Sequence, residues 1–153
     1  MTSSNLIKKE LLQQLQSLVM EKITTAQSMI NTAKESKNNE TKSTAGDKYE
    51  TGRAIMQAEQ EKSEVRLSEA QRLDVILSSL DIKTISPIVQ LGSLVTADRG
   101  TYFVSIGLGK LKVNTSMYYS LSPAAPIGKL LMGKKMNDTF TFNGIKQTIL
   151  EVS

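Results

Sequence analysis

The stretch that decides the fold is Ser43-Thr44-Ala45-Gly46-Asp47-Lys48-Tyr49-Glu50-Thr51-Gly52-Arg53. It lies between two long helical patterns and holds two carboxylates, Asp47 and Glu50, three residues apart. Residues with this spacing share one face of a helix, with Cβ atoms about 5–6 Å apart, so the pair can approach a single hard cation. The same spacing fits a capping box, in which an N-cap Asp and the Glu three positions later each satisfy a free backbone N–H. The spacing by itself leaves both interpretations open.

On both sides of this stretch, apolar residues recur every three or four positions. From about Ser4 to Ser36 there is no Pro or Gly, and the stripe consists of Leu12, Leu15, Val19, Ile23, Ala26, Ile30 and Ala33. From Asp47 to about Leu80 the seam consists of Tyr49, Met56, Leu67, Ala70, Leu73, Leu77 and Leu80, with interruptions at Gln60 and Ser63. The polar run 36–44 has no apolar period and is interpreted as the turn. These patterns predict a long antiparallel helical hairpin, a coiled coil with arms about 50 Å long.

The composition changes at residues 82–87, the predicted linker, and β-rich runs follow. The predicted strands are Val89 to Ala97, Thr101 to Ile106, Leu111 to Leu121, 139–142 and 145–152. Pro126 to Gly133 has Pro where a helix starts and Gly where one stops, so a short helix is predicted there. Asn143-Gly144 predicts a tight hairpin between the last two strands. The fold class is therefore α+β, with the hairpin in residues 1–81, its acidic tip near 37–50, and a small β-rich domain in 88–153.

Charge and missing residue types limit the chemistry. The net charge is +4: residues 1–80 hold eleven basic and eleven acidic residues, and residues 81–153 hold eight and four. The sequence contains no His and no Cys, so imidazole or thiolate catalysis, zinc sites built on those ligands, and disulfides are excluded. No signal peptide and no run of 18 apolar residues is recognised, so the expectation is a soluble cytoplasmic protein without a membrane partner.

Two motifs carry a resemblance to a known family. Gly46-Asp47-x-x-Glu50 resembles the Gly-Asp-x-x-Glu tip motif of the bacterial Gre transcription elongation factors, the GreA/GreB family. The stretch Pro126-Ile127-Gly128-Lys129-Leu130-Leu131-Met132-Gly133-Lys134 is similar to that family's Pro-Ile-Ala-Arg-x-Leu-Ile-Gly-Lys. The resemblance covers nearly the whole chain in the order of its parts and implies an FKBP-like second domain. The chain departs from the family at Thr51-Gly52-Arg53, where Asn and then Ala-Glu-Tyr are usual, and at Ala125, where Ser is common. It looks like a divergent subgroup.

The resemblance implies a function exerted inside another protein. Gre factors insert the hairpin into the secondary channel of RNA polymerase and promote cleavage of backtracked transcripts, without being enzymes themselves. Carried over, Asp47 and Glu50 would act in trans in the polymerase active centre and hold a Mg²⁺ and a water there. The isolated chain would bind no cofactor. Lys42, Lys48 and Arg53 would contact the polymerase or the 3′ end of the nascent RNA, and Pro126, Lys129 and Lys134 would dock on the polymerase. A monomer without sequence-specific DNA binding is expected.

Other functions are compatible with the same sequence. A Gre-like regulator could occupy the channel without promoting cleavage. An FKBP-like domain also suggests a peptidyl-prolyl isomerase or chaperone, although such sites are lined by aromatics and this half has no Trp and few Phe. A structural coiled-coil protein would need a second apolar face, and these helices show only one seam. The cations around the tip and near Lys129 have plain structural explanations as well, as solvated lysines or as charges favoured at a helix C-terminus.

Overall fold

The computed structural model describes residues 3–40 and 46–153, and the side chains of residues 3–38 and 50–153. The chain divides into two compact units. One comprises Met1–Gln16 and Val75–Ser153, and the other comprises Ser17–Asp74. The segment 82–87 lies within the first of these units. The architecture is α+β, with two long packed helices and a six-stranded sheet, as the sequence predicts.

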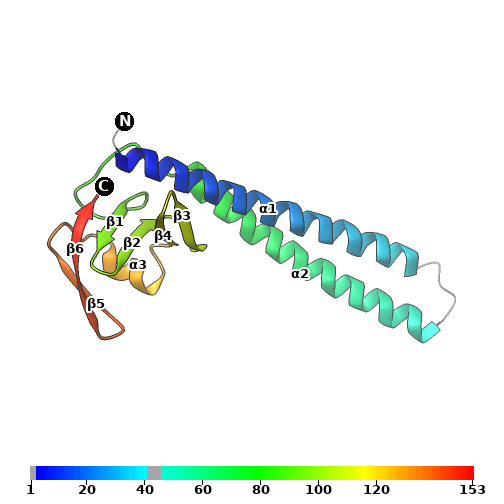
Figure 1. Ribbon diagram of the computed structural model, residues 1–153. Coiled ribbons are helices and arrows are strands. Elements are labelled where there is room, and N and C mark those ends of the chain that lie inside the picture. Colours follow the sequence, from blue (N-terminus) through cyan, green and yellow to red (C-terminus); the bar gives the residue numbers. More distant parts are fainter. Residues whose placement is uncertain (1–2, 41–45) are drawn as a thin grey trace. The chain divides into compact units, whose positions relative to one another are not determined.

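The unit Ser17–Asp74 is a helical hairpin built from parts of α1 (Ser3–Glu40) and α2 (Gly46–Ser78), which lie side by side (Figure 1). Its interface contains mostly small side chains: Ala26, Ala33, Ser63 and Ala70 are all buried. Small residues allow two helix backbones to approach closely. Ser63, which interrupts the apolar pattern in the sequence, is only 1% exposed and belongs to this interface.

The end of α1 corrects one sequence prediction. Residues 36–40, predicted to belong to the turn, continue the helix to Glu40, and residues 41–44 of that turn lie outside the described residues. Lys37 explains the difference, because its Nζ donates hydrogen bonds across the hairpin to Gln57 Oε1 at 2.8 Å and Gln60 Oε1 at 3.1 Å. A polar turn of helix without an apolar period is therefore stabilised by contacts with α2.

The other unit is organised by a mixed sheet with the strand order β3-β4-β2-β1-β6-β5. Strands β2 and β4 are parallel and the other neighbours are antiparallel. The strands are β1 (Leu94–Ala97), β2 (Gly100–Val104), β3 (Gly109–Val113), β4 (Ser116–Leu121), β5 (Thr139–Phe142) and β6 (Ile145–Val152). The helix α3 (Pro126–Leu131) contributes Leu131 to a core that also contains Val95, Val104 and Ile149. These four side chains are fully buried.

Three strand predictions need correction, and one hairpin is confirmed. The run Leu111–Leu121 is two strands, because Asn114 adopts a left-handed φ of 56° and turns the chain between β3 and β4. The first strand begins at Leu94 and not at residue 89, because Gly92 (φ 96°) turns the chain just before it. The strand predicted over 101–106 is Gly100–Val104. The Asn143-Gly144 turn is present, with φ values of 51° and 77° and Phe142 paired with Ile145.

The first turns of α1 pack against this sheet within the same unit. Leu11 and Leu15 are completely buried, and Gln14 Nε2 donates a 2.8 Å hydrogen bond to the carbonyl of Lys112 on β3. Strand β3 is one edge of the sheet. An edge strand exposes unpaired backbone groups that favour association with other chains. The helix therefore contacts this edge strand through the bond from Gln14.

Candidate functional site at the start of the second helix

The predicted acidic pair lies at the N-terminal end of α2. Because α2 begins at Gly46, Asp47 and Glu50 are the second and fifth residues of one helix. Their spacing of three puts their Cβ atoms on one face, about 5–6 Å apart. This end of a helix also favours negative charge, because the peptide dipoles point their positive ends toward it. Glu50 is exposed, and the side chain of Asp47 is outside the described residues.

Two carboxylates can supply only part of a metal site. Mg²⁺ takes six oxygen ligands in near-octahedral geometry and is commonly held by one or two carboxylates with waters and phosphates. Within the described residues, no group of three or more Asp, Glu, His or Cys side chains is arranged to hold a metal ion. The donor chemistry of Asp47 and Glu50 fits Mg²⁺, and the remaining ligands would have to come from a partner or from solvent.

The cations predicted to contact RNA or polymerase differ in what the structure says of them. Lys42 is outside the described residues, and so is the side chain of Lys48. Arg53 is half-buried, and its buried Nη1 atom makes no hydrogen bond within the described residues. Lys37, which also flanks the tip, is engaged by the two glutamines of α2. Lys34 is exposed. Among the described flanking cations, Lys34 is therefore the one that is exposed and takes part in no ion pair within the described residues.

The second predicted surface lies on α3. Pro126 and Lys129 are exposed, and Lys134 is half-buried just beyond the helix C-terminus. The backbone there is fixed by two hydrogen bonds to Val89: its N–H donates to the carbonyl of Lys134, and its carbonyl accepts from Gly133. Of the three predicted docking residues, Pro126 and Lys129 thus belong to α3, and Lys134 lies on backbone that is paired with Val89.

Gly128 explains one difference from the family motif, which has Ala at this place. A Cβ at Gly128 would collide with the carbonyl oxygen of Ser122 and would lie 3.1 Å from the carbonyl carbon of Pro123. Helix α3 therefore packs closer to the preceding turn than an alanine allows.

Lys8 is a buried residue that the sequence analysis missed. Its side chain has no exposed surface, and burial lowers the pKa of its ammonium group, an effect that the carboxylate of Asp81 partly opposes. The pKa of Asp81 is lowered by hydrogen bonds from the Thr84 side chain and from the backbone N–H groups of Thr84 and Lys83, with a smaller effect of Lys8. Leu11 and Leu15 follow Lys8 by three and seven residues, so all three lie on the same face of the helix. This spacing could have predicted from the sequence that Lys8 is buried.

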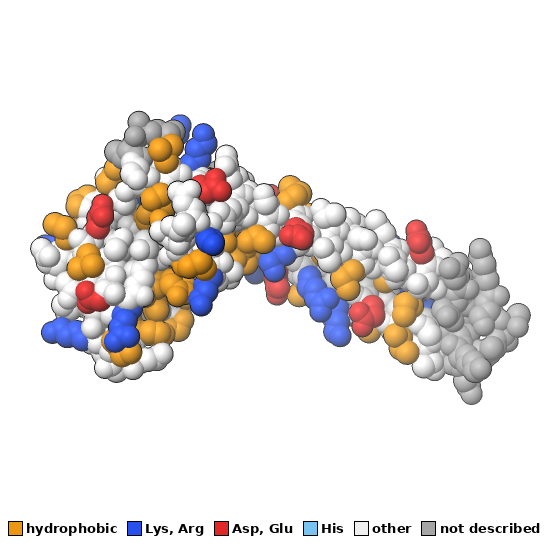
Figure 2. Space-filling model, in the orientation of Figure 1, with side chains coloured by type: hydrophobic (Ala, Val, Ile, Leu, Met, Phe, Trp, Pro, Cys, Tyr) orange, Lys and Arg blue, Asp and Glu red, His pale blue; other side chains and the backbone are white. Residues whose placement is uncertain are grey.

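Acidic and basic side chains are interspersed along the visible surface of the hairpin unit (Figure 2).

In the part of the chain that the structure describes, no helix has both the length and the hydropathy needed to cross a bilayer. The sequence matches no model of a known protein family and no curated protein.

Proposed function

We propose that this protein is a transcription elongation factor that binds RNA polymerase, inserts its helical hairpin into the secondary channel and promotes cleavage of backtracked transcripts. The observation that carries the proposal is the position of Asp47 and Glu50. Both belong to α2 and directly follow the connection between the two helices of the hairpin. A pair of carboxylates at that point suits delivery into a catalytic centre that another protein supplies.

The physical properties of the hairpin support this role. Helix α1 has 38 residues and is about 57 Å long at 1.5 Å per residue. The bonds from Lys37 to Gln57 and Gln60 connect the two helices close to the tip. These bonds connect one helix to the other and would help to hold the start of α2 in position. Such positioning matters, since misplacing a reacting group by about 1 Å can reduce a rate on the order of a hundredfold.

At the polymerase active centre, the residues of this chain would bind and orient, and the polymerase would perform the cleavage. Asp47 and Glu50 would hold one side of a shared Mg²⁺ and accept hydrogen bonds from a water in its shell. The ion, when bound, lowers the pKa of the attacking water and stabilises the in-line displacement at phosphorus. Lys42, Lys48 and Arg53 would neutralise backbone phosphates of the RNA 3′ end. Pro126, Lys129 and Lys134 would dock on the polymerase surface.

A second function is favoured by one observation. Arg53 lies about one helical turn after Glu50, at the position where the Gre family usually has Glu, so this chain has a positive charge there in place of a negative one. A cation at that place competes with a metal ion for the carboxylates. The chain would then occupy the channel and regulate the polymerase without promoting cleavage.

The experiment uses a cognate polymerase stalled in a backtracked complex with end-labelled RNA and Mg²⁺. Addition of the protein is expected to shorten the transcript. The double substitution Asp47→Ala/Glu50→Ala should abolish shortening and leave binding to the polymerase unchanged. A matched control, Glu21→Ala/Glu69→Ala, removes the same charge from exposed positions in the hairpin unit and should shorten RNA normally.

Three results separate the possibilities. Shortening that depends on Asp47 and Glu50 supports the cleavage function. Binding that competes with substrate entry, without shortening, supports the silent regulator and rejects cleavage. If the protein does not bind the polymerase, both functions are wrong.

A further inference from the structure

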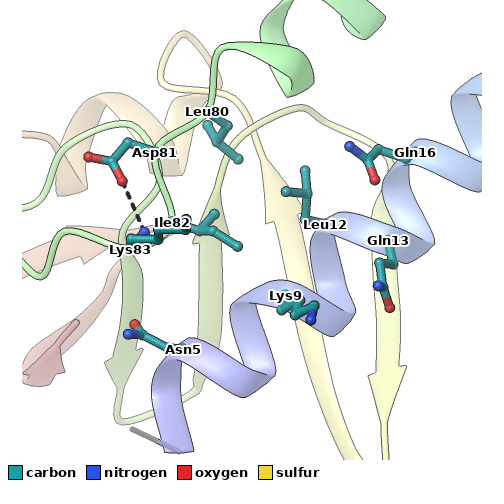
Figure 3. Close-up of a pocket in the computed structure, with 9 residues that line it drawn as sticks. All are labelled: Asn5, Lys9, Leu12, Gln13, Gln16, Leu80, Asp81, Ile82 and Lys83. Atoms are coloured by element: carbon teal, nitrogen blue, oxygen red, sulfur yellow. Dashed lines mark hydrogen bonds between the residues drawn. The ribbon is translucent and has the colours of Figure 1, made fainter. Parts of the chain in front are cut away.

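A cleft of about 560 Å³ lies in the sheet-containing unit, between the first turns of α1 and the segment that follows α2 (Figure 3). Its lining consists of Asn5, Lys9, Leu12, Gln13, Gln16, Leu80, Asp81, Ile82 and Lys83. The α1 residues extend from Asn5 to Gln16, which are about 16 Å apart along the helix at 1.5 Å per residue. This volume is in the range of ligand-binding sites.

The floor of the cleft is aliphatic. Leu80 and Ile82 face Leu12 across it (Figure 3). Leu80 is buried, and the other two are half-buried. An apolar side chain placed among these three would be removed from contact with water. Burial of apolar surface is favourable by about 25 cal/mol per Å². The cleft contains no aromatic side chain on which a nucleic-acid base could stack.

The rim provides groups that suit a peptide backbone and negative charge. Gln13 and Gln16 are exposed and make no hydrogen bond within the described residues, and each carboxamide can donate to a carbonyl and accept from an N–H. Lys9 and Lys83 are exposed as well, and neither takes part in an ion pair among the residues described. The rim thus has two uncommitted cations and two uncommitted amides.

The carboxylate of Asp81 offsets one of the two rim cations, so Lys9, Lys83 and Asp81 together leave the rim with a single net positive charge. Its Oδ1 accepts hydrogen bonds from the backbone N–H groups of Lys83 at 2.9 Å and Thr84 at 3.1 Å. The acceptor is therefore directed at its own loop, and Figure 3 shows it turned away from Leu12. Lys8 is buried and interacts electrostatically with this same carboxylate, so its charge partly compensates that of Asp81.

We infer that this cleft binds an extended acidic segment of a partner protein. An apolar side chain of the segment would fill the floor between Leu12, Leu80 and Ile82. Carboxylates on either side of it would pair with Lys9 and Lys83, and its backbone would exchange hydrogen bonds with Gln13 and Gln16. This site is separate from the acidic pair of α2, and the inference does not rest on the proposed function.

The test uses fluorescence anisotropy with the full chain and a labelled peptide in which Leu alternates with Asp and Glu. Saturable binding is expected. A peptide with Ser in place of Leu should bind more weakly, because the floor would be left unfilled, and a Leu-Lys peptide should not bind. Amide chemical shifts in residues 5–16 and 80–83 should change on addition of the acidic peptide. Absence of binding at millimolar peptide would overturn the inference, as would equal binding of the basic peptide.

Matched variants identify the surface. Lys9→Glu/Lys83→Glu should weaken binding at least about tenfold, since two exposed ion pairs become repulsive contacts. Lys22→Glu/Lys146→Glu makes the same change of charge at exposed positions outside the cleft and should alter affinity by less than about twofold. Circular dichroism checks that both variants are folded. An equal loss of affinity in the two variants would show a non-specific charge effect and would refute the site. Stronger binding of a short single-stranded RNA than of the acidic peptide would also refute it.

Discussion

Replacing Gly128 by Ala tests how closely α3 packs against the turn before it. In most exposed helices this substitution stabilises, because Ala is favoured over Gly by about 1 kcal/mol. Here the added Cβ would collide with the carbonyl oxygen of Ser122 and would lie 3.0 Å from its carbonyl carbon. These are backbone atoms and cannot rotate away. The turn is also tied to the helix, since the N–H of Ala125 donates to that same carbonyl at 3.1 Å.

The expected magnitude follows from these opposing effects. Overpacking of a buried site costs typically about 1–3 kcal/mol, and contact with fixed backbone belongs at the upper end. After subtraction of the helix-propensity gain, Gly128→Ala should destabilise the sheet-containing unit by about 2 kcal/mol. For domains of 60–100 residues each kcal/mol shifts the Tm by about 4–8 °C, so the Tm should fall by about 8–16 °C.

The measurement is a thermal melt followed by near-ultraviolet circular dichroism. Tyrosines dominate this signal, because the chain has no Trp, and Tyr102, Tyr118 and Tyr119 all belong to the sheet. Gly107→Ala is the matched control, since a Cβ there meets no atom within 4 Å, and its Tm should stay near the wild-type value. A Gly128→Ala protein that melts at or above the wild-type temperature would refute the close-packing argument.

Three further predictions concern buried or bonded charges. Lys37→Met should lower the stability of the hairpin by about 1–2 kcal/mol, because two glutamines of α2 lose their hydrogen-bond donor. Urea unfolding followed by the helical circular dichroism signal measures this loss. The control Lys34→Met, at an exposed position, should have little effect. Lys8→Met should raise the Tm, since it removes a charge that burial disfavours. Its advantage should shrink as the pH rises and the wild-type lysine, with its lowered pKa, becomes neutral in the folded state; an equal gain at every pH would contradict this cause. The lowered pKa of Asp81 predicts a contribution to stability that is fully present above its unfolded pKa of about 4 and is lost as the pH falls through the lower folded value. Asp81→Asn should therefore flatten the acid limb of a stability-versus-pH curve, and an unchanged curve would show that the carboxylate is not involved.

The sequence by itself determined the class of fold and most of its elements. The apolar periods before and after the stretch 43–53 specify two long helices, because a helix repeats every 3.6 residues and leaves this pattern in the chain. Asn143-Gly144 specified a hairpin through the left-handed backbone that its turn requires. Pro126 and Gly133 delimited α3 for equally local reasons. Each of these signals depends on neighbours in the sequence, and so it can be recognised without the fold.

Only the tertiary structure decided the features that depend on distant residues. The helical state of residues 36–40 results from bonds between Lys37 and the opposite helix, and a polar run has no local signal for such bonds. The burial of Lys8, the need for Gly128 and the cleft beside Leu12 all arise where segments far apart in the chain come together. Long-range packing depends on which side chains meet in three dimensions. The apolar period of a sequence shows only which face of a helix or strand is buried, and does not show which distant residues that face contacts.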